Sequence, residues 1–318
     1  MESSIVEKLC QALELSLSPN NETRHEAENY VFEAMEWNGF CSATLHIAST
    51  PSYNEGRKVD VNQAAAIQFK NMAETHWRFK SETHAKDTLP NGFRFIIIQQ
   101  EDKQYVHENI MNIILECKND NVKSQLHYAV ECIVRIDYPE KWPGLTEQIK
   151  EFINTEDEIQ ILTGLEALKS IIKRYEFEHD KGREPLDGIV NDLFPRLEQF
   201  VELLQNNDSS LAFDIRYRVA DLMYRANNIS MSQRYNSKEG LERLMNFYKY
   251  AIDLPISESL TTPTENSNEI AFRNNKPEWK LKAVSIHFFF RIFQKYGNPE
   301  YADDESKDFS NNFGKFVH

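Results

Sequence analysis

The sequence predicts an all-α protein in which antiparallel helix pairs stack into an α-solenoid. Apolar residues recur at spacings of three and four through nearly all of the 318 residues, which is the pattern of amphipathic helices. The one β-prone run, residues 93–98, stands alone, and an isolated strand needs partners. Paired helical segments return roughly every 40–47 residues, the period of HEAT or armadillo arrays. We therefore expect about six to seven HEAT repeats.

Turn-forming residues separate the expected helices along the chain. Ser18-Pro19-Asn20-Asn21 ends the first helix, Pro51 and Gly56 mark a loop over residues 50–58, and Leu89-Pro90-Asn91-Gly92 forms a turn. The polar stretch over residues 255–277 is expected to be a long loop between helices, with contact to a partner as the alternative. The expected helices are residues 3–17, 22–37, 39–49, 61–77, 101–118, 119–136, 142–153, 159–175, 186–204, 211–227, 239–252 and 279–296.

The helix expected over residues 61–77 presents two different faces. One face is an apolar stripe, formed by Val61, Ala65, Phe69, Met72, Ala73 and Trp77. The other is mostly polar and carries Gln63, Ile67, Lys70, Asn71, Glu74 and Arg78. A helix of this kind packs on one side and offers a patterned surface for binding on the other.

A second apolar stripe lies near the end of the chain. Phe309, Phe313, Phe316 and Val317 follow helical spacing, and the sequence stops one residue later. We expect this stripe to belong to a repeat that the chain leaves incomplete.

Composition excludes several classes of function. The formal net charge of −14 and the pI of about 5.2 disfavour nucleic-acid binding, because phosphates would be repelled, and they suit a partner with a basic surface. Only 10 glycines occur, and no phosphate-binding glycine motif is present, so no nucleotide cofactor is expected. The residues show no signal peptide and no apolar run long enough to span a membrane. Four separated cysteines are expected to be buried thiols in the cytosol or nucleus.

Catalytic and metal-binding motifs are also missing from the sequence. His25-Glu26 does not begin an HExxH motif, since residue 29 is asparagine, and no GxSxG is present. Seven other histidines lack partners at zinc-ligand spacing, so they are expected at the surface or in grooves: His76, His84, His107, His127, His179, His287 and His318. We expect neither an enzyme nor a metal site.

Several stretches together resemble the importin-beta (karyopherin-beta) superfamily. Residues 61–77, VNQAAAIQFKNMAETHW, resemble its alanine-rich N-terminal helix, which ends near a Lys-Asn pair and an aromatic residue, here Lys70-Asn71 and Trp77. Residues 136–143, IDYPEKWP, are similar to its D-x-P-x-x-W-P junction between repeats, where we expect Trp142 to pack against the seam. Residues 15–35 are similar to the opening repeat. Matches at residues 99–114, 173–177 and 279–299 look most like the branch of importins seven and eight.

The resemblance implies a right-handed solenoid that acts as a nuclear transport receptor. In this family the N-terminal repeats bind the GTP form of the GTPase Ran on the concave face, through the second helix of each pair. The corresponding helices here are residues 22–37, 60–79 and 119–136. The implied Ran-binding residues are Glu28, Asn29, Phe32, Gln63, Ile67, Lys70, Asn71, Glu74, Ser124, Tyr128, Glu131 and Arg135.

The family also implies partners and a location. Beyond Ran-GTP these are basic protein cargo and nucleoporin FG repeats, and the receptor shuttles between cytoplasm and nucleus through the nuclear pore. We expect Ran-binding repeats over residues 1–136 and continuing repeats over residues 137–318, truncated within a repeat. Neither a cofactor nor a membrane or nucleic-acid partner is expected. Two alternatives stay open: a HEAT-repeat scaffold of another assembly, and an exportin.

Overall fold

The computed structural model describes residues 3–79 and 95–297, and over these residues it contains helices and no strand. The predicted all-α class is therefore confirmed. The chain divides into two compact units, residues 1–148 and 149–318. Among the described helices, none is long and apolar enough to cross a membrane.

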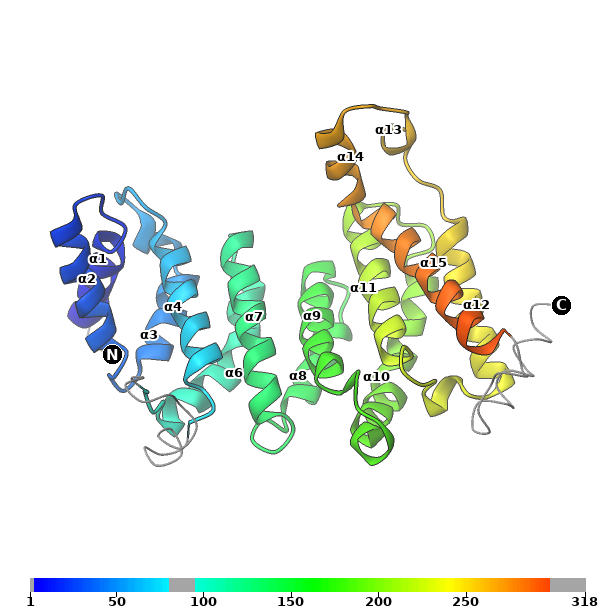
Figure 1. Cartoon of the computed structure of the whole chain (residues 1–318), viewed down its shortest axis with the longest axis horizontal. Helices are drawn as coiled ribbons and strands as arrows, with labels where there is room; N and C mark the ends of the chain where they lie inside the picture. Colours follow the sequence, from blue (N-terminus) through cyan, green and yellow to red (C-terminus); the bar gives the residue numbers. More distant parts are fainter. Residues whose placement is uncertain (1–2, 80–94, 298–318) are drawn as a thin grey trace. The chain divides into compact units, whose positions relative to one another are not determined.

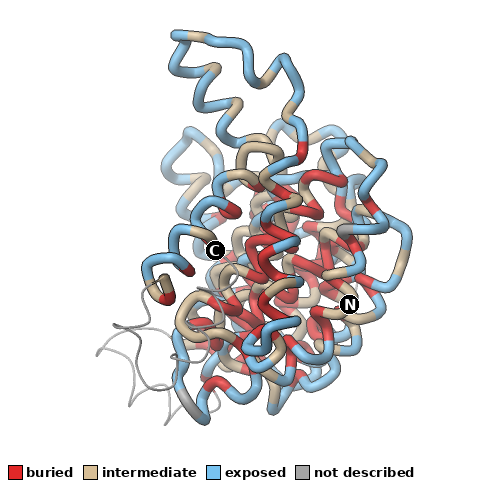
Figure 2. The backbone as a smooth tube through the Cα atoms, turned by 90° about the vertical axis from the view of Figure 1, so that its right-hand side faces the viewer, coloured by how far each residue is buried: buried red, intermediate tan, exposed pale blue. Residues whose placement is uncertain are grey.

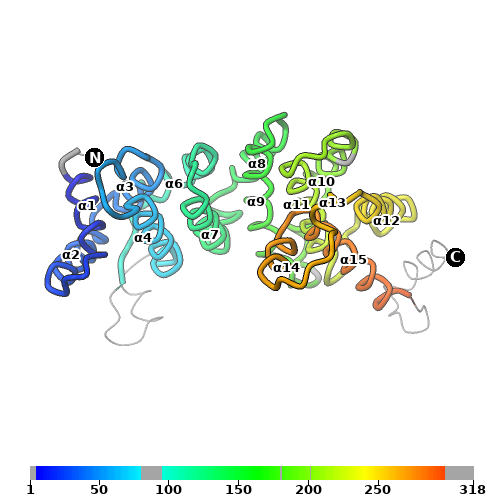
Figure 3. The backbone as a smooth tube through the Cα atoms, turned by 90° about the horizontal axis from the view of Figure 1, so that it is seen from above, coloured from blue at the N-terminus to red at the C-terminus, as the bar shows by residue number. Residues whose placement is uncertain are grey.

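The first unit consists of helices that pair in sequence order. Pairs form between α1 and α2, between α3 and α4, and between α6 and α7. Figure 3 shows α2, α4 and α7 along one side of this unit and α1, α3 and α6 along the other. The bounds are α1 Ser3–Leu15, α2 Asn21–Ala34, α3 Phe40–Ser49, the short 3-10 helix Pro51–Asn54, α4 Val61–Thr75, α6 Gln100–Glu116 and α7 Asp120–Asp137.

The second unit also consists of α-helices (Figure 1). Within it, α11 packs on both α9 and α15, and α12 packs on α15. Its bounds are α9 Glu158–Tyr175, α10 Glu184–Leu203, α11 Ser210–Ala226, α12 Lys238–Asp253, α13 Glu258–Thr261, α14 Ser267–Asn274 and α15 Pro277–Tyr296. Helix α8, Leu145–Ile153, contains the boundary between the units.

The apolar stripe predicted for residues 61–77 is the core-facing side of α4. Its members Val61, Ala65, Phe69, Met72, Ala73 and Trp77 are all buried. They pack between α3 and α7, which are the main neighbours of α4. Helical periodicity alone identified this face, because α4 has one apolar side and one polar side.

Side chains cap many of the longer helices at one end or at both. At the N-termini, carboxylate, amide or hydroxyl oxygens accept from free backbone N–H groups, as Asn20, Asp60, Asn119, Asp157, Ser209 and Ser237 do. At the C-termini, side chains from elsewhere in the chain donate to the last carbonyls. Examples are Lys103 to Trp77, Arg216 to Leu204, Arg183 to Ala226 and Lys282 to Ile252.

A buried polar cluster joins the C-terminal ends of α4 and α7 to the middle of α6. The carboxylate of Asp137 accepts from Trp77 Nε1 at 2.6 Å and from Lys141 Nζ at 2.7 Å, and it lies 3.1 Å from His107 Nε2. The imidazole of His107 stacks on the indole of Trp142, with ring centroids 4.5 Å apart. Trp142 is buried, as expected for a packing residue.

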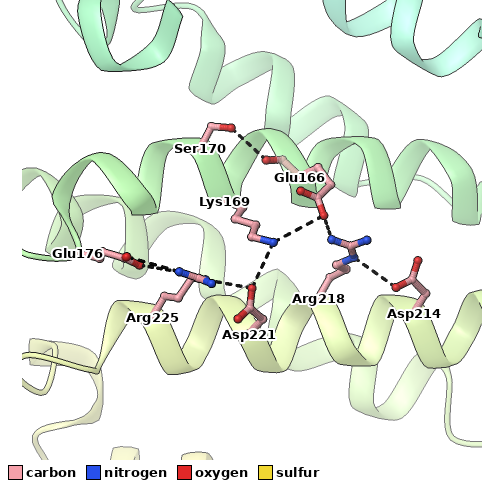
Figure 4. Close-up of polar contacts among 8 residues, drawn as sticks. All are labelled: Glu166, Lys169, Ser170, Glu176, Asp214, Arg218, Asp221 and Arg225. Carbon is pink, nitrogen blue, oxygen red and sulfur yellow. Dashed lines mark hydrogen bonds and ion pairs between the residues drawn. The ribbon is translucent and has the colours of Figure 1, made fainter. Parts of the chain in front are cut away.

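An alternating row of charges joins α9 and α11 in the second unit (Figure 4). Arg225 contacts Glu176 at 3.1 Å and Asp221 at 3.0 Å, and Lys169 lies 3.5 Å from Asp221. Further along, Arg218 pairs with both Glu166 and Asp214. Each charge lies beside one of opposite sign, so the alternating carboxylates and cations tie the two helices together.

Two expectations from the sequence are wrong. His76 and His107 are buried rather than at the surface or in a groove, because both have ring nitrogens paired in the interior; the His76 Nδ1 accepts from the Ile96 N–H at 3.3 Å. The expected loop over residues 255–277 contains two short helices, α13 and α14, the second capped by Asn266. Two other expectations, the stripe at Phe309, Phe313, Phe316 and Val317 and the turn at residues 89–92, lie outside the described residues.

Candidate functional site

The twelve candidate residues lie on α2, α4 and α7, the three helices on one side of the first unit (Figure 3). Each is exposed or half-exposed, and none belongs to the core. Phe32 is the most informative, since this large apolar side chain is 45% exposed. The structure therefore places all twelve where a partner could reach them, while their part in binding stays a prediction.

The N-terminal caps hold α4 and α7 side by side. Asp60 caps α4 by accepting from the Gln63 N–H at 2.9 Å, and its second oxygen accepts from Asn119 Nδ2 at 2.9 Å. Asn119 in turn caps α7 through its side-chain oxygen, which accepts from Asn121 and Val122. One pair of side chains thus starts both helices and fixes the register between them.

Candidates from these two helices meet in a group that we call the α4–α7 cluster: Lys70, Glu74 and Tyr128. Glu74 accepts a hydrogen bond from the Tyr128 hydroxyl at 2.9 Å. The ammonium of Lys70 lies 4.0 Å from the other Glu74 oxygen and 5.9 Å from the centre of the Tyr128 ring. The cluster presents a cation, a carboxylate and an aromatic ring together on an exposed surface.

Charge within the cluster affects the neighbouring groups. The hydrogen bond to Glu74 is the main cause that raises the pKa of Tyr128, so its hydroxyl stays protonated near neutral pH. One turn further along α7, burial and then the Glu74 charge raise the pKa of the Cys132 thiol. At the far end of α7, Arg135 pairs with Glu131 four residues earlier.

The candidates on α2 form a separate group. Helix α2 packs on α1, whereas α4 packs on α1, α3 and α7. Glu28 is paired within its own helix, lying 3.8 Å from Arg24 and 3.3 Å from His25. Glu28, Asn29 and Phe32 therefore offer a second contact surface in the first unit, apart from the α4–α7 cluster.

The remaining candidates differ in how they are held. Gln63, Ile67 and Asn71 are half-exposed along α4. The Ser124 hydroxyl donates to the Asp120 carbonyl in its own helix at 2.8 Å, so a partner would have to compete with that bond. Within the part of the chain that the structure describes, no group of three or more His, Cys, Asp or Glu residues is placed to hold a metal ion.

Sequence reasoning missed the residues that set the position of this surface. Asp60 and Asn119 were not candidates, although each stands directly before an apolar periodic segment, which is a recognisable capping signal. Their hydrogen bond to each other joins residues 59 positions apart, and no local sequence pattern predicts it.

Comparison with known proteins finds a domain match and similar proteins among the importins. Residues 27–116 match the importin-beta N-terminal domain, a span that runs from α2 through α6. Importin-8 of Danio rerio is 25% identical over 316 residues, covering 97% of this chain and 29% of that protein. A probable importin-7 homolog of Dictyostelium discoideum is 27% identical over 250 residues, covering 78% of this chain and 22% of that protein. The chain thus spans less than a third of the length of these relatives.

A solved structure shows the same fold. The exportin Cse1 in its cargo-free, cytoplasmic state matches 98% of this chain and 31% of its own, with a TM-score of 0.72 and 16% sequence identity. That likeness confirms the predicted α-solenoid. In sequence, residues 27–116 match the importin-beta N-terminal domain, and the chain is similar to importin-8 over nearly all of its residues.

Proposed function

We propose that this chain is the Ran-binding part of a nuclear transport receptor that carries protein cargo into the nucleus. The observation that supports import most directly is the similarity to importin-8 over 97% of the chain. The functional division into residues 1–136 and 137–318 remains part of the same proposal. The receptor would shuttle between cytoplasm and nucleus through the nuclear pore.

The proposed binding surface for Ran-GTP is the set of twelve candidates on α2, α4 and α7. Its exposed Phe32 and half-exposed Ile67 suit apolar groups of a partner, and the polar residues around them suit hydrogen bonds at the rim. Lys70 and Asn71 are the leading candidates, since they also belong to the motif that resembles the family.

The proposed mechanism is competition between two partners and needs no catalysis. Cargo would bind in the cytoplasm, and Ran-GTP would displace it in the nucleus. Displacement requires that each ligand lowers the affinity of the receptor for the other by the same factor. The net charge of −14 favours cargo with a basic surface, because opposite charges steer association.

Nucleoporin FG repeats are the third proposed partner. A cavity of about 520 Å³ lies between α10 and α12, lined in part by Pro195, Phe247 and Tyr250. These residues offer apolar and aromatic surface on which a phenylalanine ring could stack. Charged residues at the same cavity, including Glu202 and Arg243, would face solvent around such a ring.

Titration calorimetry with Ran tests the main proposal. The chain is expected to bind Ran loaded with a non-hydrolysable GTP analogue and to bind Ran-GDP much more weakly. Lys70→Ala combined with Asn71→Ala should weaken binding at least about tenfold, the effect of losing one or two important interface side chains. The matched control, Lys8→Ala with Gln11→Ala at exposed positions of α1, which carries none of the twelve candidates, should leave the affinity unchanged. Equal binding of both Ran forms would indicate a scaffold of another assembly.

An exportin is the second candidate, and the structural likeness to Cse1 favours it. The two functions predict opposite signs of coupling between Ran-GTP and cargo. In an importin, adding Ran-GTP lowers the affinity for cargo, whereas in an exportin it raises that affinity. Measuring the binding of one cargo protein with and without Ran-GTP therefore separates them.

A further inference from the structure

The segment between α12 and α15 has no core of its own. From Pro255 to Lys276 every described residue is exposed or half-exposed, and Ile270 and Phe272 are exposed although they are large and apolar. Figure 1 shows α13 and α14 beyond the ends of α12 and α15, and Figure 2 shows this projecting part as almost wholly exposed. A segment that buries so little opens easily to a modifying enzyme.

Thr262 and Pro263 lie in the extended stretch that joins α13 to α14. Both residues are exposed. Thr262 has φ −57° and ψ 128°, an extended backbone that fits the active-site cleft of a protein kinase. Its hydroxyl donates to the Glu258 carbonyl at 2.9 Å within α13, a single turn of four residues that is only marginally stable alone. A Thr-Pro pair in an extended, exposed segment is what proline-directed kinases recognise.

Two other Ser-Pro or Thr-Pro pairs are held more firmly. Ser18, before Pro19, is half-buried and its hydroxyl accepts from the Asn20 N–H at 3.2 Å. Thr50, before Pro51, is half-buried at the end of α3, where its carbonyl accepts from Asn62 Nδ2 at 2.8 Å. These contacts leave Thr262 as the most accessible of the three.

A cation stands beside Thr262. The Arg273 guanidinium donates to the main-chain carbonyl of Thr262 and lies 3.5 Å from that of Leu260, and it pairs with Glu269 in its own helix. Guanidinium carries five N–H donors, more than these three acceptors use. An arginine that contacts the main chain of a residue with an accessible hydroxyl is close enough to stabilise a phosphate group once it has been added.

We propose that Thr262 is a phosphorylation site for a proline-directed kinase and that Arg273 binds the resulting phosphate. The kinase would transfer the γ-phosphoryl group of ATP to Thr262 Oγ1. A phosphorus–oxygen bond to the β-phosphate breaks, the new ester bond forms, the hydroxyl proton passes to the base of the kinase, and ADP leaves. The phosphate then competes with Glu269 for Arg273 and fastens the end of α13 to α14.

Phosphorylation would also change the charge of this segment. Glu258, Glu265 and Glu269 already make it acidic, and a phosphate adds about −1.5 to −2 charges at pH 7. The modified segment would repel acidic partners and attract basic ones more strongly. This consequence holds whichever transport direction is correct, because it depends only on local charge.

Incubation of the folded chain with a proline-directed kinase and ATP, followed by mass spectrometry, tests the site. One phosphate is expected in the peptide that contains Thr262, and Thr262→Ala or Pro263→Ala should abolish it. The matched control Thr264→Ala, two residues away, should leave it unchanged. No phosphate at Thr262 while a synthetic peptide of residues 257–267 is modified would overturn the proposal, as would preferential modification at Ser18 or Thr50.

Phosphorus NMR of the modified chain tests the role of Arg273. The second pKa of phosphothreonine is about 6, and a bound guanidinium should lower it by about 0.5 pH unit. Arg273→Gln should remove the shift, and Arg273→Lys should keep part of it. An identical pKa in the parent chain and in Arg273→Gln would show that Arg273 does not bind the phosphate.

Discussion

Removing the Asp137 carboxylate is expected to destabilise the first unit strongly. The side chain is fully buried, and Trp77, His107 and Lys141 all direct polar hydrogens at it. Asp137→Ala would leave these three groups without their shared acceptor, and loss of one partner from a buried charged pair typically costs about 3–5 kcal/mol. Asp137→Asn should cost less, because the amide oxygen can still accept one of the three hydrogen bonds.

The dependence of stability on pH gives a second value for the free energy that Asp137 contributes. Burial alone would raise the pKa of Asp137, but hydrogen bonds from His107, Lys141 and Trp77 outweigh it and lower the pKa to about 2. Since each pH unit corresponds to 1.36 kcal/mol, the drop from 3.8 is worth about 2 kcal/mol of stability. A lowered folded-state pKa means that this stability is complete above pH 3.8 and is lost as pH falls toward 2.

Urea unfolding monitored by tryptophan fluorescence measures both effects. Trp77 donates to Asp137 directly, so its emission reports the cluster itself. The difference in unfolding free energy between the parent chain and Asp137→Asn should be constant above about pH 5 and shrink below about pH 4. A cost below about 1 kcal/mol for Asp137→Ala, or a difference between the parent chain and Asp137→Asn that does not change with pH, would refute the assignment of Asp137 as the charged centre of the cluster.

Three further predictions follow from local contacts. Gly164→Ala should destabilise the fold by about 1–3 kcal/mol, because the added Cβ would lie 2.8 Å from Phe152 Cβ. Gly188→Ala, in exposed space on α10, should instead stabilise it by about 0.5–1 kcal/mol. Thermal unfolding compares the two variants, and equal effects would contradict the packing at Gly164. Arg218→Ala should lower the free energy of unfolding by about 1 kcal/mol at low salt and by less at 1 M salt, since it leaves Glu166 and Asp214 without their shared cation. A loss of stability that salt does not alter would exclude an electrostatic role. Thiol reagents at pH 8 should label the native chain slowly, because burial raises the pKa of Cys10 to about 11 and also raises the pKa values of Cys41 and Cys132. Rapid labelling before unfolding would show that these thiols are accessible.

Periodicity predicted the fold because each long helix has one apolar face. The stripe from Val61 to Trp77 is buried along its full length, and the four cysteines are buried as expected. The partners of polar residues could not be predicted in this way. His107 was expected at the surface or in a groove, yet it is buried between Asp137 and Trp142, residues that follow it by 30 and 35 positions. Only the packing of three helices brings these side chains together.

The short helices α13 and α14 were missed for a different reason. Most of their residues are polar, none is buried, and the few apolar ones form no long stripe that would mark them as helical. What holds α14 is local: the Asn266 cap and the ion pair between Glu269 and Arg273. An Asn followed three residues later by Glu is a capping signal, but in a polar background it is too weak to outweigh the loop composition.

The candidate site shows how helix register, in addition to residue type, decides which side chains can act together. Lys70 follows the cap Asp60 by ten residues, and Tyr128 follows the cap Asn119 by nine. At 1.5 Å per residue these positions lie about 15 Å and about 13.5 Å from two caps that are hydrogen-bonded to each other. The two side chains therefore reach the same level of adjacent helices, where Glu74 contacts both. Sequence analysis could name these residues separately, but the link between the caps is what makes α4 and α7 a single surface, and α2, which lacks such a link to α4 among the described contacts, adds its residues as a second one.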